Sequence, residues 1–444
     1  MTIKSPKRFL CLALTMVFVA GISYGENLAD DSRIATALKM IDIWIDAEVD
    51  YKDIPGMSVA IVYDQNVIWS NGYGYAHVDK KAAVTPSTIY SICSISKLFT
   101  SISIMKLRDE GKLRLDDPVK THLPWFNIKD NFPDAPEVTI RGILTHSSGL
   151  PREADYPYWT GPVHNFPTRE EIRAKLSNQE ELYPAETYFQ YSNLGMSLLG
   201  EIVAAASGKP FDEYVQENIL NPLKLKDTSP EIPEGKQGGQ LATGYTGKSR
   251  EGAREAIPFY HVNGIAPAAG FASTVEDLAR FASWQFRLLE KGGTEILSAN
   301  TLKEMHRVHW VDPDWKTTWG LGFSITRKND KTIVGHGGYC PGYRTQLMMY
   351  PKEKIAVIVM TNALDVNPSS YAANIFALVA PEITKAVKTP GEAKASPPEL
   401  EKFVGRYQRG LDSERYVLIK EGELITFSLP NTNPNEAIMK LRYI

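Results

Sequence analysis

Residues 88–102 read TIYSICSISKLFTSI, and the interpretation of the whole chain starts from this stretch. It is strand-like at first and becomes helical near Ser94, because apolar residues then recur at helical spacing. Ser94 and Lys97 are three residues apart at this helix start, so their side chains lie one turn above each other on the same face. We therefore expect the Ser94 hydroxyl and the Lys97 amine to touch.

Contact between these two side chains matters because a serine hydroxyl is a poor nucleophile until a base takes its proton. A lysine can be that base where burial or the positive end of a helix dipole lowers its pKa. The same helix start points free backbone N–H groups at an oxyanion that forms beside Ser94. Nucleophile, base and part of an oxyanion hole therefore fit into four residues.

The Ser-x-x-Lys spacing alone is weak evidence, because Ser103-Ile104-Met105-Lys106 repeats it inside the same predicted helix. There we expect the Ser103 hydroxyl to bond back to a carbonyl or to face solvent. The simpler interpretation of Ser94 is a helix N-cap. Partners elsewhere in the chain have to decide between the two interpretations.

The composition describes an ordinary globular protein. Of its 444 residues, 43% are hydrophobic and 23% are charged, and the formal net charge is −3. This balance shows neither the basic footprint of a nucleic-acid-binding protein nor a polybasic membrane patch. The length is sufficient for one large two-lobed domain with an appendage.

The N-terminus has the pattern of a secretory signal peptide over residues 1–25. Basic residues precede an apolar run at 9–22, and Ser23 and Gly25 put small residues at positions −3 and −1 of a cleavage site. A membrane anchor is the alternative, but the run is shorter than the ~20 residues that a spanning helix needs. We expect an exported protein that starts near Glu26, is periplasmic or secreted, and has no stable membrane insertion after cleavage.

The apolar patterns predict an α/β fold of two lobes: an antiparallel sheet with helices on its faces, beside a mostly helical lobe from about residue 110 to 265. A helix is expected over 33–48. Strands are expected at 56–63, 67–75, 332–338, 344–350 and 355–361. The last three strands need partners, and the hairpin formed by the first two is the natural one.

Two later helices have clear ends in the sequence. The helical pattern that follows Asn193 stops at Gly208, which is a C-cap signal. Thr274 and Asp277 form a capping box at the start of another amphipathic helix.

The domain organisation follows from these patterns. Residues 26–384 form the main domain, and 385–398 are a linker by their Pro, Gly and Ala content. Residues 399–444 contain a β-hairpin at 416–429 but are too few for an independent core. This short β-rich segment must therefore dock on the main body or belong to a larger module.

Two more motifs follow the first at generous spacing: Tyr191-Ser192-Asn193 and His336-Gly337-Gly338. In this order, the three resemble the active-site motifs of the serine β-lactamase and penicillin-binding-protein superfamily. The most similar branch holds class C β-lactamases, D-alanyl-D-alanine carboxypeptidases and related esterases. The resemblance covers roughly residues 33–380, because four further strings match in order, at 144–150, 270–274, 319–323 and 361–362.

The resemblance implies a role for each matching residue. Ser94 would be the acylated nucleophile, Lys97 its proton partner, and Tyr191 would pass the proton to the leaving group. The amide of Asn193 would hold Lys97 and a carbonyl of the substrate. The oxyanion hole would consist of the backbone N–H groups of Ser94 and Tyr339, the residue that follows Gly338.

His336 departs from the family pattern. Many members have a lysine there followed by a hydroxyl residue, and that pair binds the carboxylate of the substrate. Imidazole and Gly337 weaken the recognition of an anionic β-lactam or peptide terminus. Arg344 is one candidate for a substitute anion clamp, and the alternative is that it simply faces solvent from a strand.

Simpler interpretations stand beside these roles. His336 could be a strand-end histidine bonded to a carbonyl, and Tyr191 could be core packing. His306 and His309 are three residues apart, but no third metal ligand of matching spacing accompanies them. The resemblance implies no metal and no cofactor.

Export leaves Cys93 and Cys340 in an oxidising compartment, both beside the motifs. A disulfide between them is one alternative, but we favour Cys93 as a small buried apolar residue behind the nucleophile.

We expect an exported serine hydrolase that forms a covalent acyl-enzyme with one of three substrates: a D-amino-acid peptide or peptidoglycan fragment, a β-lactam, or a simple ester or amide. The altered third motif makes β-lactam turnover the least secure of these. The alternative is an inactive or catalytically weak cell-wall-binding or scaffold protein of the same fold. The presence of all the catalytic groups argues against that alternative.

Overall fold

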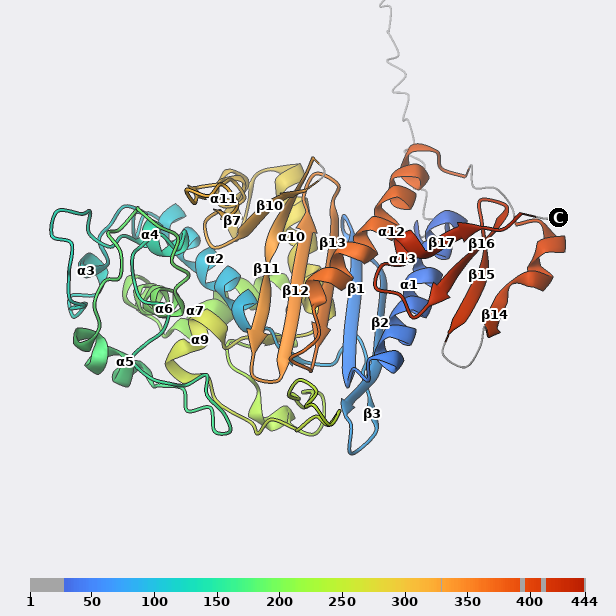
Figure 1. The fold of residues 1–444 in the computed structure, drawn as a ribbon. Coiled ribbons are helices and arrows are strands. Elements are labelled where there is room, and N and C mark those ends of the chain that lie inside the picture. Colours follow the sequence, from blue (N-terminus) through green and yellow to red (C-terminus); the bar gives the residue numbers. More distant parts are fainter. Residues whose placement is uncertain (1–27, 329, 392–395, 409–412, 443–444) are drawn as a thin grey trace, which may run out of the picture.

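A large antiparallel sheet forms the centre of the molecule (Figure 1). The computed structural model describes residues 28–328, 330–391, 396–408 and 413–442, so the predicted signal peptide lies outside the described part. Within the described residues, this sheet has nine strands in the order β3-β2-β1-β13-β12-β11-β10-β9-β8. Their bounds are β1 Gly56–Tyr63, β2 Asn66–His77, β3 Ala82–Ala83, β8 Trp310–Val311, β9 Thr318–Trp319, β10 Ser324–Lys328, β11 Lys331–Cys340, β12 Tyr343–Tyr350 and β13 Ile355–Thr361.

The predicted pairing of the N-terminal hairpin with the C-terminal strands is confirmed. β1 pairs with β13 in the register Val59↔Val359, so two segments about three hundred residues apart form the middle of one sheet. Every residue of β13 is buried, as expected for a strand rich in valine and isoleucine with both faces covered.

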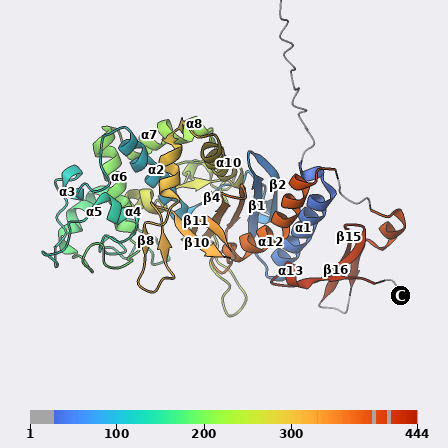
Figure 2. The same ribbon diagram turned by 90° about the horizontal axis from the view of Figure 1, so that it is seen from above.

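Helices cover both faces of this sheet (Figure 2). α10, Val275–Lys291, packs on one face, while α1, Ser32–Tyr51, and α12, Pro368–Lys388, pack on the other. Their apolar sides meet the sheet, and the rings of Trp44 and Tyr371 lie 5.2 Å apart where α1 contacts α12. α12 continues to Lys388, four residues into the segment that we expected to be a linker.

The helical lobe lies beside the sheet, and a helix that is buried along most of its length connects the two. That helix is α2, Ser96–Asp109, which packs against α6, Asn193–Ser207, and α9, Ala266–Ala269. Phe99 of α2 stacks on Phe271 at 4.9 Å. The remaining helices of the lobe are α3 Val119–His122, α4 Ile140–Leu144, α5 Arg169–Lys175, α7 Phe211–Val215 and α8 Asn221–Leu223.

The two predicted helix ends have different outcomes. Gly208 caps α6 with φ of +73°, a conformation that glycine adopts without strain, and this confirms the C-cap. At the start of α10, the Thr274 hydroxyl accepts from the Asp277 N–H at 3.1 Å, which is one half of a capping box. The buried Asp277 carboxylate does not return to the Thr274 backbone. It accepts instead from the backbone N–H of Asp227 at 2.8 Å, in a loop that packs against the start of α10.

The C-terminal segment forms a small sheet that packs on α1 and α12. Its elements are β14 Gly405–Gln408, β15 Glu414–Lys420, β16 Glu423–Leu429, α13 Pro434–Ala437 and β17 Ile438–Lys440. Phe427 is fully buried against the main body, and Lys420 reaches the buried Glu382 of α12 at 2.9 Å. Within the described residues, no helix has the combination of length and apolar character that crossing a membrane requires.

Candidate active site

Ser94 lies in a tight turn immediately before α2. Cys93–Ile95 form one turn of 3-10 helix, in which side chains three residues apart eclipse each other. As expected, the Lys97 Nζ lies 3.2 Å from the Ser94 Oγ. Ser94 is not the N-cap of α2, since Ile95 holds that position and no side chain caps it, so the simpler interpretation does not apply.

Lys97 is completely buried and has three oxygen neighbours. Besides Ser94, its Nζ contacts the Asn193 Oδ1 at 2.7 Å and the Ala268 carbonyl at 2.8 Å. An amide oxygen and a carbonyl oxygen can only accept, so they take two N–H hydrogens. Burial lowers the pKa of Lys97 well below its usual value. In the neutral amine, the remaining position is a lone pair that faces the Ser94 hydroxyl.

The second Ser-x-x-Lys string is structural. The Ser103 hydroxyl is buried in α2 and donates to the Phe99 carbonyl one turn earlier, at 2.9 Å. Of the two outcomes expected for Ser103, the structure shows the bond back to a carbonyl of the helix.

Tyr191 closes the site from the helical lobe. Its ring lies 4.3 Å from the His146 ring, and the His146 Nδ1 accepts from the Ser192 N–H at 3.2 Å, which fixes the loop that carries Tyr191. Burial raises the pKa of Tyr191, while its interaction with the Ser94 side chain lowers it. The effect of burial is the larger one, so the pKa of Tyr191 is raised and its phenol is protonated in the free enzyme. Tyr191 is therefore suited to donate a proton rather than to take the first one.

The third motif lies on a free edge of the sheet. On one side, β11 pairs with β12 as far as Cys340. On the other side, β11 pairs with β10 only as far as Gly335. Among the described residues, 336–340 therefore have a strand partner on one side only. A Cβ on Gly338 would come within 2.4 Å of the Ile92 carbonyl, so only glycine lets β11 approach the chain before Ser94 this closely. Ser94, Asn193 and Tyr339 line one cavity of about 440 Å³.

His336 cannot supply the cation that is missing from the third motif. Its Nδ1 donates to the Gly337 carbonyl at 2.6 Å, as in the simpler interpretation, and burial lowers its pKa to about 3. The side chain is therefore neutral. Arg344 pairs with Tyr339 across β11 and β12, so the two side chains share one face of the sheet. The Arg344 guanidinium stacks 5.0 Å from the Tyr339 ring and donates to the Leu364 carbonyl. Arg344 thus contacts the wall of the cavity but does not line it.

The family model for Beta-lactamase matches residues 41–381, which is well over half of the sequence. The chain belongs to the beta-lactamase family. This confirms the resemblance inferred from the three motifs, and the two-lobed fold is that of the beta-lactamase family as well.

Two relatives from different organisms match this chain at under 30% identity. "Protein flp" of Staphylococcus aureus (strain MW2) is 27% identical over 342 residues, covering 76% of this chain and 64% of that protein. "Beta-lactamase-like protein 2" of Dictyostelium discoideum is 28% identical over 334 residues, covering 74% of this chain and 60% of that protein. The match thus spans less than two thirds of the length of these relatives.

Solved structures extend the comparison. The octameric penicillin-binding protein homologue from Pyrococcus abyssi aligns with a TM-score of 0.68 and 28% identity, over 91% of this chain and 90% of that one. A D-amino acid amidase from Ochrobactrum anthropi SV3, complexed with L-phenylalanine amide, aligns with a TM-score of 0.63 and 23% identity, over 80% of this chain and 99% of that one. The second likeness shows the fold alone.

A disulfide corrects our interpretation of the cysteines in this member of the beta-lactamase family. Cys93 and Cys340 are bonded, with their Cα atoms 5.6 Å apart, so Cys93 is not merely an apolar filler. Cys93 has φ of +53°, an uncommon conformation for a residue other than glycine. The bond joins the residue before Ser94 to the residue after Tyr339. It therefore ties together the two backbone segments that would form the oxyanion hole.

Removing this crosslink is expected to lower the rate of acylation. In the double variant Cys93→Ala/Cys340→Ala, we expect kcat to fall about tenfold with a smaller change in KM, because misplacing a catalytic group by 1 Å can cost about 100-fold. Stability should fall by about 2–5 kcal/mol. Stopped-flow acylation by a fluorophosphonate, at a temperature where circular dichroism shows the variant folded, measures the effect. An unchanged acylation rate would contradict a positioning role.

Two residues of the cavity escaped the sequence analysis. Arg152 and Glu153 follow the 144–150 string after Pro151, and both line the cavity with Ser94. A charged pair immediately after a motif loop was the signal that could have revealed them. The Glu153 carboxylate accepts a hydrogen bond from the Asn193 side-chain amide at 2.8 Å. The Arg152 guanidinium stacks on the Tyr191 ring at 4.8 Å.

His306 and His309 do not form a metal centre. The His306 Nε2 bonds with the Gln285 amide oxygen at 2.9 Å, and the His309 Nε2 donates to the Glu304 carbonyl at 2.9 Å. The described residues contain no group of three or more potential metal ligands.

Proposed function

We propose that this protein is an exported serine hydrolase that acts on an amide or ester through a covalent acyl-enzyme. The arrangement of Lys97 supports this most directly. Its two obligatory acceptors, Asn193 and Ala268, leave the lone pair of the neutral amine directed at the Ser94 hydroxyl. A structural lysine would need its charge matched by a carboxylate within ion-pair distance, and no such ion pair of Lys97 occurs among the described residues.

The reaction would proceed in two stages. Lys97 takes the Ser94 proton while the Oγ attacks the substrate carbonyl, and the N–H groups of Ser94 and Tyr339 stabilise the oxyanion. When the C–N or C–O bond breaks, the leaving group receives a proton from the Tyr191 hydroxyl, and Tyr191 recovers one from Lys97. Water then attacks the acyl ester with the same groups in reverse roles, and Ser94 is restored.

The neutral His336 bears on the choice of substrate. An anionic β-lactam would meet no fixed cation at the third motif, so we place it behind peptides and amides of D-amino acids and simple esters. Export is supported by the disulfide, because such bonds persist in oxidising compartments. Mass spectrometry of the N-terminus of the exported protein tests it.

Labelling and turnover together test the proposed function. We expect a fluorophosphonate to label the protein once per chain, with the adduct mapped to Ser94 by peptide mass spectrometry. We also expect multiple turnover of p-nitrophenyl acetate or of a D-alanyl-D-alanine peptide, with nitrocefin slower than either. Labelling without multiple turnover of any of the three would favour a binding or scaffold protein instead. Turnover with the adduct mapped to another residue would refute the assignment of the nucleophile.

A further inference from the structure

The cavity that contains Ser94 is apolar over much of its wall. The apolar lining consists of Trp159, Pro162, Ile257, Pro258, Pro341 and Leu364. The charges of Arg152 and Glu153 are paired with each other, with the Nε 3.1 Å from the Oε1. Glu255 is exposed, so water can solvate its carboxylate. The cavity therefore offers a ligand mainly apolar surface beside the nucleophile.

Contacts between aromatic side chains hold this wall in place. The Trp159 ring packs edge-on against Phe166 at 4.9 Å, and Phe166 stacks on Tyr260 at 5.5 Å. The Tyr260 hydroxyl then donates to the Pro341 carbonyl at 2.9 Å. These contacts join the helical lobe, the loop that precedes α9 and the turn after β11. Because the wall is already formed, a ligand loses little binding free energy to ordering it.

The cavity extends to one side of the nucleophile. Cys340 lines it, whereas Tyr191 and His336, whose rings lie 6.1 Å apart, do not. Along an extended strand, His336 and Cys340 are about 13 Å apart, with the N–H of Tyr339 between them. Since Tyr191 gives its proton to the leaving group in the proposed reaction, the leaving group lies at the His336 end. The acyl part of the substrate then extends toward Cys340 and into the cavity.

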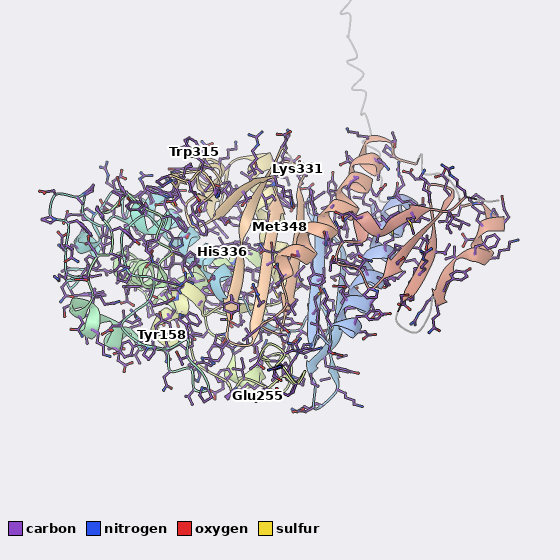
Figure 3. The ribbon with its side chains drawn as sticks, viewed as in Figure 1. Tyr158, Glu255, Trp315, Lys331, His336 and Met348 are labelled. Atoms are coloured by element: carbon purple, nitrogen blue, oxygen red, sulfur yellow. A yellow bond between two sulfur atoms is a disulfide. The ribbon has the colours of Figure 1, made fainter. Side chains whose placement is uncertain are left out.

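Figure 3 agrees with this direction. In that view, β11 runs downward from Lys331 through His336. Tyr158 and Glu255, which lie on the two loops that carry the apolar wall, are labelled below His336. These loops are thus at the Cys340 end of β11.

From these observations we infer that the acyl part of the substrate carries a bulky apolar group, aromatic or branched aliphatic, that packs against Trp159 and Ile257. This inference rests on the proposed function, because it places that group relative to a carbonyl attacked by Ser94. The cavity volume of about 440 Å³ lies within the range of small-molecule sites. Burial of the group is favourable in proportion to its apolar area. The substrate class is then esters, amides or peptides whose acyl residue has a large apolar side chain.

Esters with a common leaving group isolate the acyl part. We would compare the p-nitrophenyl esters of acetic, phenylacetic and succinic acid, with each kcat/KM divided by the rate constant for hydrolysis by hydroxide. We expect the phenylacetyl ester to exceed the acetyl ester by about 10- to 100-fold, the range for burying one phenyl ring. The anionic succinyl ester should be no better than the acetyl ester. Equal values for all three, or a preference for the succinyl ester, would overturn the inference.

Boronic acids remove the leaving group from the comparison. They bind reversibly through a bond between boron and a serine Oγ, and their substituent occupies the acyl side only. We expect the inhibition constant of benzylboronic acid to be at least about tenfold lower than that of methylboronic acid. Equal inhibition constants would show that the acyl side has no apolar preference.

Variants test the two loops of the wall separately. In Trp159→Ala, we expect the preference for the phenylacetyl ester to fall at least about fivefold, while kcat/KM for the acetyl ester changes less than about threefold. Ile257→Thr, on the other loop, should act in the same direction and covers the case in which Trp159→Ala does not fold. Equal losses on both esters in these variants would indicate a purely structural role and overturn the inference.

Trp315→Ala is the matched control. Trp315 is 82% exposed, lies outside the cavity and is labelled at the top of Figure 3. Its replacement should leave kcat/KM for the acetyl and phenylacetyl esters unchanged.

The outcome also distinguishes this inference from the proposed function. Turnover of all three esters by the unmodified protein without a preference for the phenylacetyl ester leaves the hydrolase intact and overturns the apolar site. Absence of turnover of every ester, together with failure of the fluorophosphonate to label Ser94, overturns both.

Discussion

Replacing Ser94 with alanine is expected to lower kcat/KM by about 10⁴-fold or more and to abolish labelling by a fluorophosphonate or a penicillin probe. Covalent catalysis has no alternative nucleophile once this hydroxyl is removed, and the residual rate comes only from binding and the oxyanion hole. Ser94 is half-buried, and its hydroxyl interacts only with the side chains of Lys97 and Tyr191 among the contacts described above. The free energy of unfolding should therefore change by less than about 1 kcal/mol.

Ser103→Ala is the control for this variant. Ser103 has the same spacing to a lysine and is a buried serine of α2, the helix that follows Ser94, but its hydroxyl bonds to the Phe99 carbonyl. We expect Ser103→Ala to retain turnover within about threefold and to keep full labelling. Undiminished hydrolysis by Ser94→Ala would refute the assignment of the nucleophile. Equal losses in the two variants would instead indicate damage to α2.

The sequence supports those parts of the site that depend on short spacing. Ser94 and Lys97 had to meet, because a helical turn brings residues three apart into contact whatever surrounds it. The sheet was predictable because its strands alternate or run continuously apolar, and because the C-terminal strands lacked partners that the 56–75 hairpin could supply. That the three motifs come together could be expected only from the family resemblance. No pattern of neighbouring residues predicts that Tyr191 or His336 lies near Ser94.

Other features depend on contacts between distant segments, which no local pattern encodes. The Cys93–Cys340 bond requires two Cα atoms 247 residues apart to come within 5.6 Å, and only the approach of β11 over Gly338 accomplishes this. Glu153 resembles any charged loop residue in the sequence, and its role appears only when Asn193 of α6 points toward it. Arg344 was a candidate anion clamp by position, but its guanidinium stacks on the Tyr339 ring and donates to the Leu364 carbonyl, so it does not line the cavity.

Replacing Lys97 with methionine is expected to lower kcat/KM by about 10²- to 10⁴-fold, the usual contribution of a general base. The methionine side chain has similar length and remains apolar in a fully buried position, although the Asn193 Oδ1 and the Ala268 carbonyl then lose a donor. That loss should cost about 1–3 kcal/mol of stability. Steady-state kinetics with p-nitrophenyl acetate, alongside thermal unfolding, separates the loss of catalysis from the loss of folded protein.

The pH profile gives the sign of the Lys97 effect. A general base acts only when unprotonated, so kcat/KM should rise with pH and reach a plateau once Lys97 is neutral. Because burial lowers its pKa, the plateau should begin well below the pH at which an exposed lysine loses its proton. His336, with its pKa lowered to about 3, should add no step between pH 5 and 8.

Lys97→Arg distinguishes a base from a fixed positive charge. Arginine keeps a cation at this position but is not deprotonated in proteins, so a base mechanism predicts that it is as inactive as Lys97→Met across the whole pH range. If Lys97 served only to attract an anionic substrate or to stabilise the oxyanion, Lys97→Arg would retain much of the activity and the pH-dependent rise would disappear. Two buried acceptors hold the Lys97 amine so that only its lone pair can face Ser94, and this geometry argues for the first outcome.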